Sequence, residues 1–254
     1  ATNMALALQC AHHEIVGSMS LHESSCRQLA ERVGCFWTTN MEQLRSDADL
    51  YVIAVSDHAV PEVVNALGRI VPHAFVVHTA GSLSMEVYKN SPIKHFGIFY
   101  PLQTFSKGRV VDFHLLTCFV EADGASSLNV LKNLAQSLGS RVFELSSSDR
   151  RYLHLAAVFA CNFSNHCYAI AGEILKHCGI PFDVLLPLID ETAGKVHEMS
   201  PRDAQTGPAV RFDENVLSSQ KTLLSQDFDY LDIYSLLSSD IQKMKKSCDE
   251  DDKL

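Results

Sequence analysis

The feature that most constrains the fold is a series of short apolar segments alternating with amphipathic ones, which stops a little past the middle of the chain. Segments such as 50–57 and 74–82 begin with continuous apolar runs, 50–55 and 74–77, which are typical of strands buried on both faces of a sheet. Segments 22–34 and 59–70 have the spacing of amphipathic helices. Strands that alternate with helices predict βαβ units. We therefore predict an α/β fold with a parallel sheet over residues 1–146.

The residues from 147 to 254 indicate helices alone. One long helix is expected from about residue 150 to Gly179, because glycine commonly ends a helix. Pro181 then opens the next helix, and one or two further helices follow to about residue 246. The change of pattern predicts a second, all-helical domain over 147–254.

Composition narrows the class of function. Thirty acidic against 21 basic residues give a formal net charge of −9, which weighs against a nucleic-acid partner because phosphate binders present basic faces. No apolar run reaches the roughly 18–20 residues that span a bilayer, so no membrane partner is expected. Eight cysteines without a C-x-x-C pair predict free, buried thiols, a cytoplasmic protein and no metal. Cys161 and His166, five residues apart, are the one metal-binding alternative.

The expected strand ends carry small and polar residues. In parallel α/β sheets, ligands bind outside the carboxyl ends of the strands. The loops expected at those ends are 18–22, 55–59, 78–82 and 100–104. They are predicted to form the floor of a ligand site.

Several long stretches, in order along nearly the whole chain, resemble one bacterial family. They are ATNMALAL, HTAGSLSME, GIFYPLQTFSK, HLAAVFACNFSNH, PLIDETAGKVHE and TGPAVRFDEN. That family is described as NADP oxidoreductases with a Rossmann-like domain and a C-terminal helical domain of unknown function. More distantly, the chain is similar to pyrroline-5-carboxylate reductase, ketopantoate reductase and hydroxyisobutyrate dehydrogenase.

The resemblance implies a Rossmann-type dinucleotide-binding domain at 1–146 and a helical dimerisation and substrate domain at 147–254. It implies an NAD(P)-dependent oxidoreductase that transfers a hydride to or from a small carbonyl, imine or hydroxy acid. It also implies a homodimer formed through the helical domain, which often completes the partner's site in such families. The alternative is a non-catalytic, dinucleotide-binding regulatory or structural dimer.

The N-terminal stretch resembles the continuation of a strand and a Gly-x-Gly-x-x-Ala turn. Ala1 matches the last, small position of that turn, and the strand and both glycines are missing. We therefore expect the sequence to be a fragment of a longer chain. Thr2 and Asn3 would lie in the first helical turn near a bound phosphate.

The choice between the two dinucleotides depends on the end of the second expected strand. NAD enzymes carry an acid there for the ribose hydroxyls, and residues 18–20 contain none. We therefore favour NADP, with NAD as the alternative, and expect Ser20 and His22 near the phosphate. The remaining predicted cofactor-binding residues follow the next strands: Val55, Ser56, His58, Thr79, Ala80 and Gly81.

The long helix carries the predicted catalytic residues His154, Asn162 and His166. With Val158 they are spaced by four, so we expect them on one slowly drifting face. In the related reductases, the position that matches Val158 is often a lysine. Either histidine could replace it as a proton donor. The alternative is that these polar groups are hydrogen-bonded in the core or in a dimer interface.

Predicted substrate-binding residues come from both halves of the chain. They are Ser82, Tyr100, Gln103, Thr104, Asn165 and Arg211. Arg211 could bind a carboxylate with its planar fork, or it could brace a loop with Asp213. The strand-end segments could equally be ordinary turns. Ser56, Asp57 and His58 are the residue types of a hydrolase catalytic triad. Three consecutive residues after a strand, however, cannot take the positions of nucleophile, base and orienting acid, so a hydrolase is not predicted.

Overall fold

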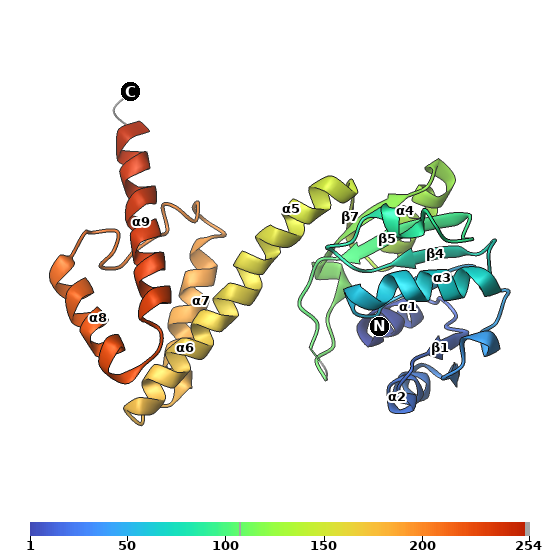
Figure 1. The fold of residues 1–254 in the computed structure, drawn as a ribbon, viewed down its shortest axis with the longest axis horizontal. Helices are drawn as coiled ribbons and strands as arrows, with labels where there is room; N and C mark the ends of the chain where they lie inside the picture. The colour runs from blue at the N-terminus through green and yellow to red at the C-terminus, as the bar shows by residue number, and fades with distance from the viewer. Residues whose placement is uncertain (107, 252–254) are drawn as a thin grey trace. The chain divides into compact units, whose positions relative to one another are not determined.

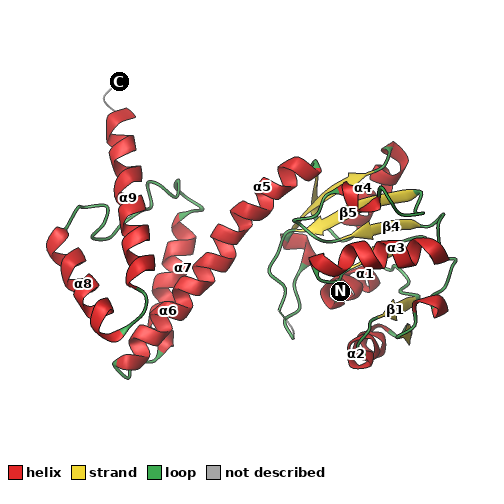
Figure 2. Ribbon diagram, in the orientation of Figure 1, coloured by secondary structure: helices red, strands yellow, loops and turns green. Residues whose placement is uncertain are grey.

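The computed structural model describes residues 1–106 and 108–251, and the chain divides into two compact units (Figure 1). The first unit is Ala1–Asn162 and the second is Phe163–Leu254. Figure 2 shows strands and helices in the first unit and helices joined by loops in the second. The unit boundary lies beyond the predicted domain boundary at 146/147, which remains a prediction about where the functional domains meet.

The first unit alternates strands and helices. Its elements are α1 (Thr2–Cys10), β1 (Gly17–Met19), α2 (Glu23–Val33), β2 (Phe36–Thr38), β3 (Tyr51–Ile53), α3 (Val60–Ile70), β4 (Phe75–His78), β5 (His95–Pro101), β6 (Thr117–Ala122), α4 (Ala125–Ser137), β7 (Arg141–Glu144) and α5 (Ser147–Ala157). Short 3-10 turns lie at η1 (Met41–Gln43), η2 (Asp57–Ala59), η3 (Met85–Tyr88) and η4 (Phe113–Leu115). The predicted α/β class is confirmed.

The second unit consists of helices in the part of the chain that the structure describes. They are α6 (Ser164–His177), the 3-10 turn η6 (Phe182–Leu185), α7 (Leu186–Lys195), α8 (Glu214–Asp227) and α9 (Leu231–Asp251). A π-helical segment, η5 (Val158–Phe163), links α5 to α6. The long helix expected from 150 to 179 is therefore present, but with a π-helical turn inside it.

The larger sheet has the order β3-β4-β5-β6-β7, and β1 and β2 form a separate parallel pair. All neighbours in the larger sheet are parallel except β5 and β6, which are antiparallel. A parallel return needs a crossover, usually a helix, and the described residues between β5 and β6 contain only the 3-10 turn η4. The uniformly parallel sheet expected from the sequence is therefore wrong at this one pair.

The division of the strands into two sheets is relevant to the strand that the sequence predicts upstream of Ala1. In the Rossmann order 3-2-1-4-5-6, such a strand would stand between β1 and β3. These two strands belong to different sheets in the structure. The upstream strand itself remains a prediction.

The core of the first unit lies on both faces of the larger sheet. Val76 and Val77 are neighbours in β4 and both are fully buried, but they belong to different clusters, because successive side chains of a strand point to opposite faces. Val77 and Phe99 pack with residues of α1 and α4. Val76 packs with Val64 of α3. Both faces of the sheet are thus covered by helices.

A local signal in the sequence located the end of α2. Gly34 ends α2 in the left-handed conformation, with φ of 71°, as its position predicted. Strand β2 was not predicted, because its apolar run covers only residues 35–37, whereas the equally short β3 lies within the longer apolar run 50–55. Among the described cysteines, which are free thiols, Cys10, Cys167 and Cys178 are exposed, so the expected burial is wrong for these three.

No described helix is long and apolar enough to cross a membrane.

Candidate functional site

The carboxyl ends of β3, β4 and β5 meet at one edge of the larger sheet, because the three strands are parallel neighbours. The backbone N–H of Thr79 donates to the Ile53 carbonyl at 3.1 Å, which ties the end of β4 to the end of β3. The loops that follow these strands therefore lie side by side, as expected from the sequence.

A cavity of about 430 Å³ opens at this edge of the sheet. The N-terminus of α1, one face of α2, the ends of β3, β4 and β5, and the loop after β5 line it. The predicted site residues that line it are Ala1, Thr2, Asn3, Thr79, Tyr100 and Gln103. A single cavity therefore brings together six residues that were predicted separately.

Tyr100 of β5 and His154 of α5 form a polar pair beside the β4 loop. The Tyr100 hydroxyl lies 3.3 Å from His154 Nδ1. A Cβ at Gly81 would lie 2.7 Å from Cζ of Tyr100 and 2.9 Å from His154 Nδ1. Since real Cβ atoms do not approach other atoms so closely, glycine is required where the loop passes the two rings.

The environment of Tyr100 keeps its hydroxyl protonated. Burial raises the pKa of Tyr100, the negative charge of Asp57 raises it further, and the positive charge of Arg150 opposes both. A phenol with a raised pKa is a hydrogen-bond donor at neutral pH. When Tyr100 donates to Nδ1 of His154, the proton of the neutral imidazole lies on Nε2.

Asp57 joins the loops after β3 and β4. The Ser82 hydroxyl donates to Asp57 Oδ2, whereas Ser56 Oγ lies 3.4 Å from Nε2 of His58. The carboxylate thus orients Ser82 in the next loop. The consecutive serine, aspartate and histidine do not form the nucleophile, base and orienting acid of a hydrolase.

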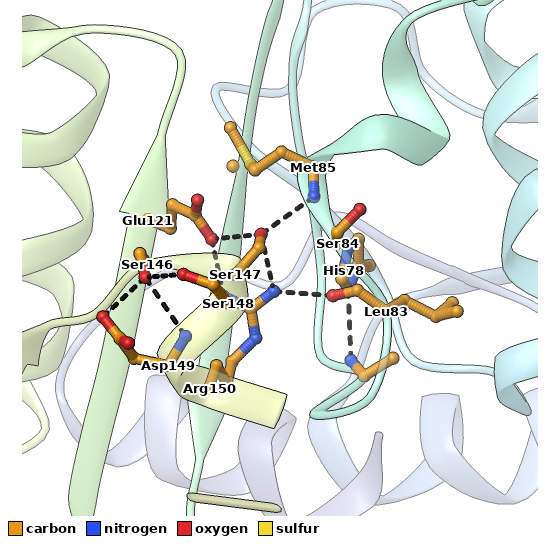
Figure 3. A network of polar contacts seen from close by, with 12 residues as sticks. His78, Leu83, Ser84, Met85, Glu121, Ser146, Ser147, Ser148, Asp149 and Arg150 are labelled. Atoms are coloured by element: carbon orange, nitrogen blue, oxygen red, sulfur yellow. Dashed lines mark hydrogen bonds and ion pairs between the residues drawn. The ribbon is translucent and has the colours of Figure 1, made fainter. Parts of the chain in front are cut away.

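A buried arginine anchors α5 to the sheet (Figure 3). Arg150 forms an ion pair with Glu121 Oε2 at 2.6 Å, and its side chain is 1% exposed. It also donates to the Leu83 carbonyl at 2.6 Å and to Ser147 Oγ at 3.1 Å. His154 lies one helical turn further along α5.

The remaining predicted cofactor residues lie outside the cavity lining. Ser20 and His22 precede α2, where the Ser20 hydroxyl accepts the backbone N–H of His22 at 3.1 Å. Val55, Ser56 and His58 are exposed after β3, and Ala80 and Gly81 are buried after β4. Their roles toward a cofactor stay predictions.

The predicted catalytic and substrate residues are divided between the two units. Ser82 and Thr104 are exposed in the first unit, as is Asn162 at its end. Asn165, His166 and Arg211 are exposed in the second unit. The π-helical segment also interrupts the expected face, because its i→i+5 bonds insert a residue into the four-residue spacing. Asp213 caps α8, its carboxylate accepting the backbone N–H of Val216 at 3.2 Å.

Sequence reasoning missed several residues of this region. Arg32 and Gln28 of α2 and Arg109 of the loop after β5 line the cavity. Arg32 and Gln28 are four apart on a predicted amphipathic helix, a spacing that could have suggested a common face. Arg150 gives no such signal, because arginine is rarely buried. No group of three or more potential metal ligands occurs among the described residues.

Two family models match the chain. The Rossmann-like domain matches residues 1–103, and the "Domain of unknown function (DUF2520)" matches residues 116–241. No match was found among curated proteins.

Solved structures match over nearly the whole chain. A Bacteroides fragilis protein described as a "putative NADP oxidoreductase" is 45% identical, with a TM-score of 0.91, over 96% of this chain and 94% of that chain. A Thermotoga maritima protein is 23% identical, with a TM-score of 0.72, over 97% and 96%. A Plasmodium falciparum pyrroline carboxylate reductase with NADP bound is 10% identical, with a TM-score of 0.60, over 96% and 93%. The last two show a shared fold. Because the Bacteroides protein is 45% identical over 96% of this chain, and both family models match, this chain belongs to the family in which a Rossmann-like domain is followed by the DUF2520 domain.

Proposed function

We propose that the protein is an oxidoreductase that uses NADP to transfer a hydride to or from a small carbonyl, imine or hydroxy acid. The Bacteroides protein is described as an NADP oxidoreductase, and the Plasmodium reductase has NADP bound, which supports an oxidoreductase that uses NADP. The observation that carries the proposal is the Tyr100–His154 pair. It lies where parallel strands end, and Tyr100 lines the cavity there.

The residues of the cavity fit a dinucleotide. Thr2 and Asn3 stand in the first turn of α1, and Arg32 and Arg109 add two cations to the same cavity. Helix N-termini and arginines are the groups that bind phosphates. These four residues would hold the phosphates. No acid stands at the end of β1, residues 17–19, which supports NADP over NAD.

The residues of the protein would transfer the proton, and the cofactor would transfer the hydride. A bound nicotinamide supplies or accepts the hydride. For reduction, His154 would take up a solvent proton at Nδ1, which would turn the Tyr100 hydroxyl from His154 toward the substrate. Tyr100 would then donate its hydroxyl proton to the substrate oxygen or nitrogen and receive the Nδ1 proton, leaving the neutral imidazole with its proton on Nε2. Oxidation reverses the path. The catalytic roles of Asn162 and His166 and the substrate-binding roles of Asn165 and Arg211 remain predictions.

Titration of the full native chain with NADPH and then NADH tests the cofactor. Quenching of Trp37, the single tryptophan, is the readout, and saturable binding that prefers NADPH is expected. Failure to bind either nucleotide contradicts the proposal. Binding without turnover of any small carbonyl or imine would instead favour the non-catalytic dimer, an alternative supported by Val158 at the position of the expected lysine.

Substitution of the pair tests its role. His154→Gln and Tyr100→Phe should each lower kcat by about a hundredfold or more, the usual contribution of a general acid. NADPH affinity should stay near that of the parent protein. His73→Gln, at an exposed position of the same unit, is the matched control and should keep parent kcat. His166→Gln tests the alternative proton donor, and a larger loss there than at His154 would reassign that role.

We also propose a homodimer formed through the helical unit. Leu188 of α7, Leu223 of α8 and Leu236 of α9 are 62%, 56% and 71% exposed. Apolar side chains exposed in such number are typical of interaction surfaces.

A further inference from the structure

Among the described residues of the first unit, Arg150 is the most deeply buried charge. Its side chain is 1% exposed, and the Glu121 carboxylate that it contacts is 23% exposed. Three groups from separate segments meet at its guanidinium: Glu121 of β6, Ser147 of α5 and the Leu83 carbonyl of the loop after β4. Figure 3 shows the guanidinium among them. Arg150 thus joins the start of α5 to strand β6 and to the loop after β4.

Ser147 completes the attachment. Its hydroxyl donates to the same Glu121 oxygen at 2.6 Å, and its Oγ accepts the backbone N–H of Met85 at 3.1 Å. Together, Ser147 and Arg150 fix the first turns of α5 in rotation as well as in position, because they contact the sheet through different atoms of two side chains.

The register of the sheet brings this attachment to the face that carries Tyr100. In the antiparallel pair β5–β6, Ile98 stands opposite Glu121 and Tyr100 stands opposite Phe119. Opposed residues, and residues two apart on one strand, share a face. Tyr100 and Glu121 therefore lie on the same face. His154, four residues after Arg150, shares the helix side of Arg150 and meets Tyr100 there at 3.3 Å.

We propose that Arg150 is a positioning residue for the Tyr100–His154 pair, which it aligns by holding α5 to Glu121 and the Leu83 carbonyl. The inference rests on the proposed function for its kinetic test only. Arg150 touches neither reacting group and acts through the geometry and the charge that it brings to the pair.

The charge of Arg150 offers a readout that a purely structural role would not move. The groups that act on Tyr100 are His154 and Arg150 from α5 and Asp57 from η2. The positive charge of Arg150 lowers the pKa of Tyr100, against burial and the charge of Asp57. Removing that charge should therefore raise the pKa of Tyr100.

The test variant replaces both members of the ion pair by apolar residues, Arg150→Met with Glu121→Leu. Replacing a buried ion pair by apolar groups is often neutral for stability, whereas removing one partner is not. Arg151→Met is the matched control, because it removes the same charge from the exposed neighbouring position on α5. Circular dichroism establishes folding, and phenol absorbance titration, each protein minus its Tyr100→Phe version, follows Tyr100 without cofactor or substrate.

The expected result is a folded double variant with parent NADPH affinity and a kcat about a hundredfold lower, as misplacement of reacting groups produces. Its Tyr100 pKa should be higher than in the parent, and Arg151→Met should change neither property. Parent kcat and parent Tyr100 pKa in the double variant would overturn the inference.

Ser147→Ala keeps the inference testable if the double variant does not fold. It keeps every charge and removes the three hydrogen bonds of Ser147 Oγ, those with Glu121, Met85 and Arg150. We therefore expect kcat to fall by about tenfold at unchanged KM, within the range that misplacement costs. Parent kcat in this variant would overturn the inference. If the parent protein itself neither binds NADPH nor turns over a carbonyl, the proposed function fails, while the Tyr100 titration still decides whether Arg150 acts on the tyrosine.

Discussion

The two compact units differ in how completely they cover their own apolar side chains. In the first unit, helices cover both faces of a sheet, and residues such as Val64, Val77 and Phe99 are fully buried. In the second, the described buried apolar residues are Ala209, Leu217 and Leu224. The first unit therefore contains a complete core, and the second does not.

The difference follows from architecture. A sheet between helices offers two faces that can be closed within one unit. In a small group of amphipathic helices, each helix can bury one apolar stripe against its neighbours. Its other apolar side chains stay exposed unless a further layer of structure covers them. In the second unit, α8 and α9 pack on each other, with Tyr234 donating to Gln220 Oε1 at 2.6 Å. The open apolar faces are the basis of our homodimer proposal.

The largest expected effect tests the closed core. Phe99→Ala should lower the free energy of unfolding by about 3–5 kcal/mol, because it leaves a cavity in a fully buried cluster. Trp37 lies in the first unit, so its fluorescence during denaturation follows that unit alone. Phe143→Ala is the control: its side chain is 48% exposed and should cost below about 1 kcal/mol. Equal losses of unfolding free energy at both positions would contradict the conclusion that the first unit contains a complete core.

The next effect concerns a titratable group in that core. Burial and the charge of Arg150 lower the pKa of His78 from 6.5 to about 4. Between these values the unfolded chain binds a proton that the folded chain does not, so stability should fall by about 3 kcal/mol as the pH drops from 6.5 to 4. Below pH 4 this contribution no longer changes.

Denaturation of the parent and His78→Gln across this pH range, followed by Trp37 fluorescence, isolates the contribution as a difference. His73→Gln, an exposed position in the same unit, should keep the parent slope. A parent slope in the His78 variant would show that the histidine does not titrate as its burial implies.

A smaller effect tests the open faces of the second unit. Leu236→Glu should weaken self-association by about 2 kcal/mol, roughly thirtyfold in the dimer dissociation constant, as for a central interface residue. Light scattering across a concentration series measures it. Leu115→Glu makes the same change at an 83% exposed leucine of the first unit and should leave the mass unchanged. A monomeric parent protein would contradict the dimer proposal.

The sequence predicted what depends on local pattern. Apolar runs located the strands of the larger sheet, and Gly34 marked the end of α2. Tyr100 and His154 were each named as site residues. Their contact was not predicted, because 54 residues separate them and only the packing of α5 on the sheet brings them together.

The features that were missed depend on tertiary structure. The antiparallel pairing of β5 and β6 follows from a connection without a crossover helix. Arg150 is buried because Glu121 of β6 and the Leu83 carbonyl, both distant in sequence, meet it beside Ser147 of its own helix. No local pattern encodes the meeting with the two distant groups. The π-helical segment likewise breaks a spacing that appeared regular in the sequence.

The smallest effect compares the same chemistry in both units. Ser146 caps α5 by accepting the backbone N–H of Asp149 at 3.2 Å, and Asp213 caps α8 in the same way at 3.2 Å from Val216 N. Ser146→Ala and Asp213→Ala should each cost about 1 kcal/mol, followed by Trp37 fluorescence for the first and far-ultraviolet circular dichroism for the second. Asparagine at either position should keep most of the cap. Because a cap is a local interaction, the two losses should be equal although the cores differ. A much larger loss for Asp213→Ala would mean that the open helical unit depends on α8 far more than the closed unit depends on α5.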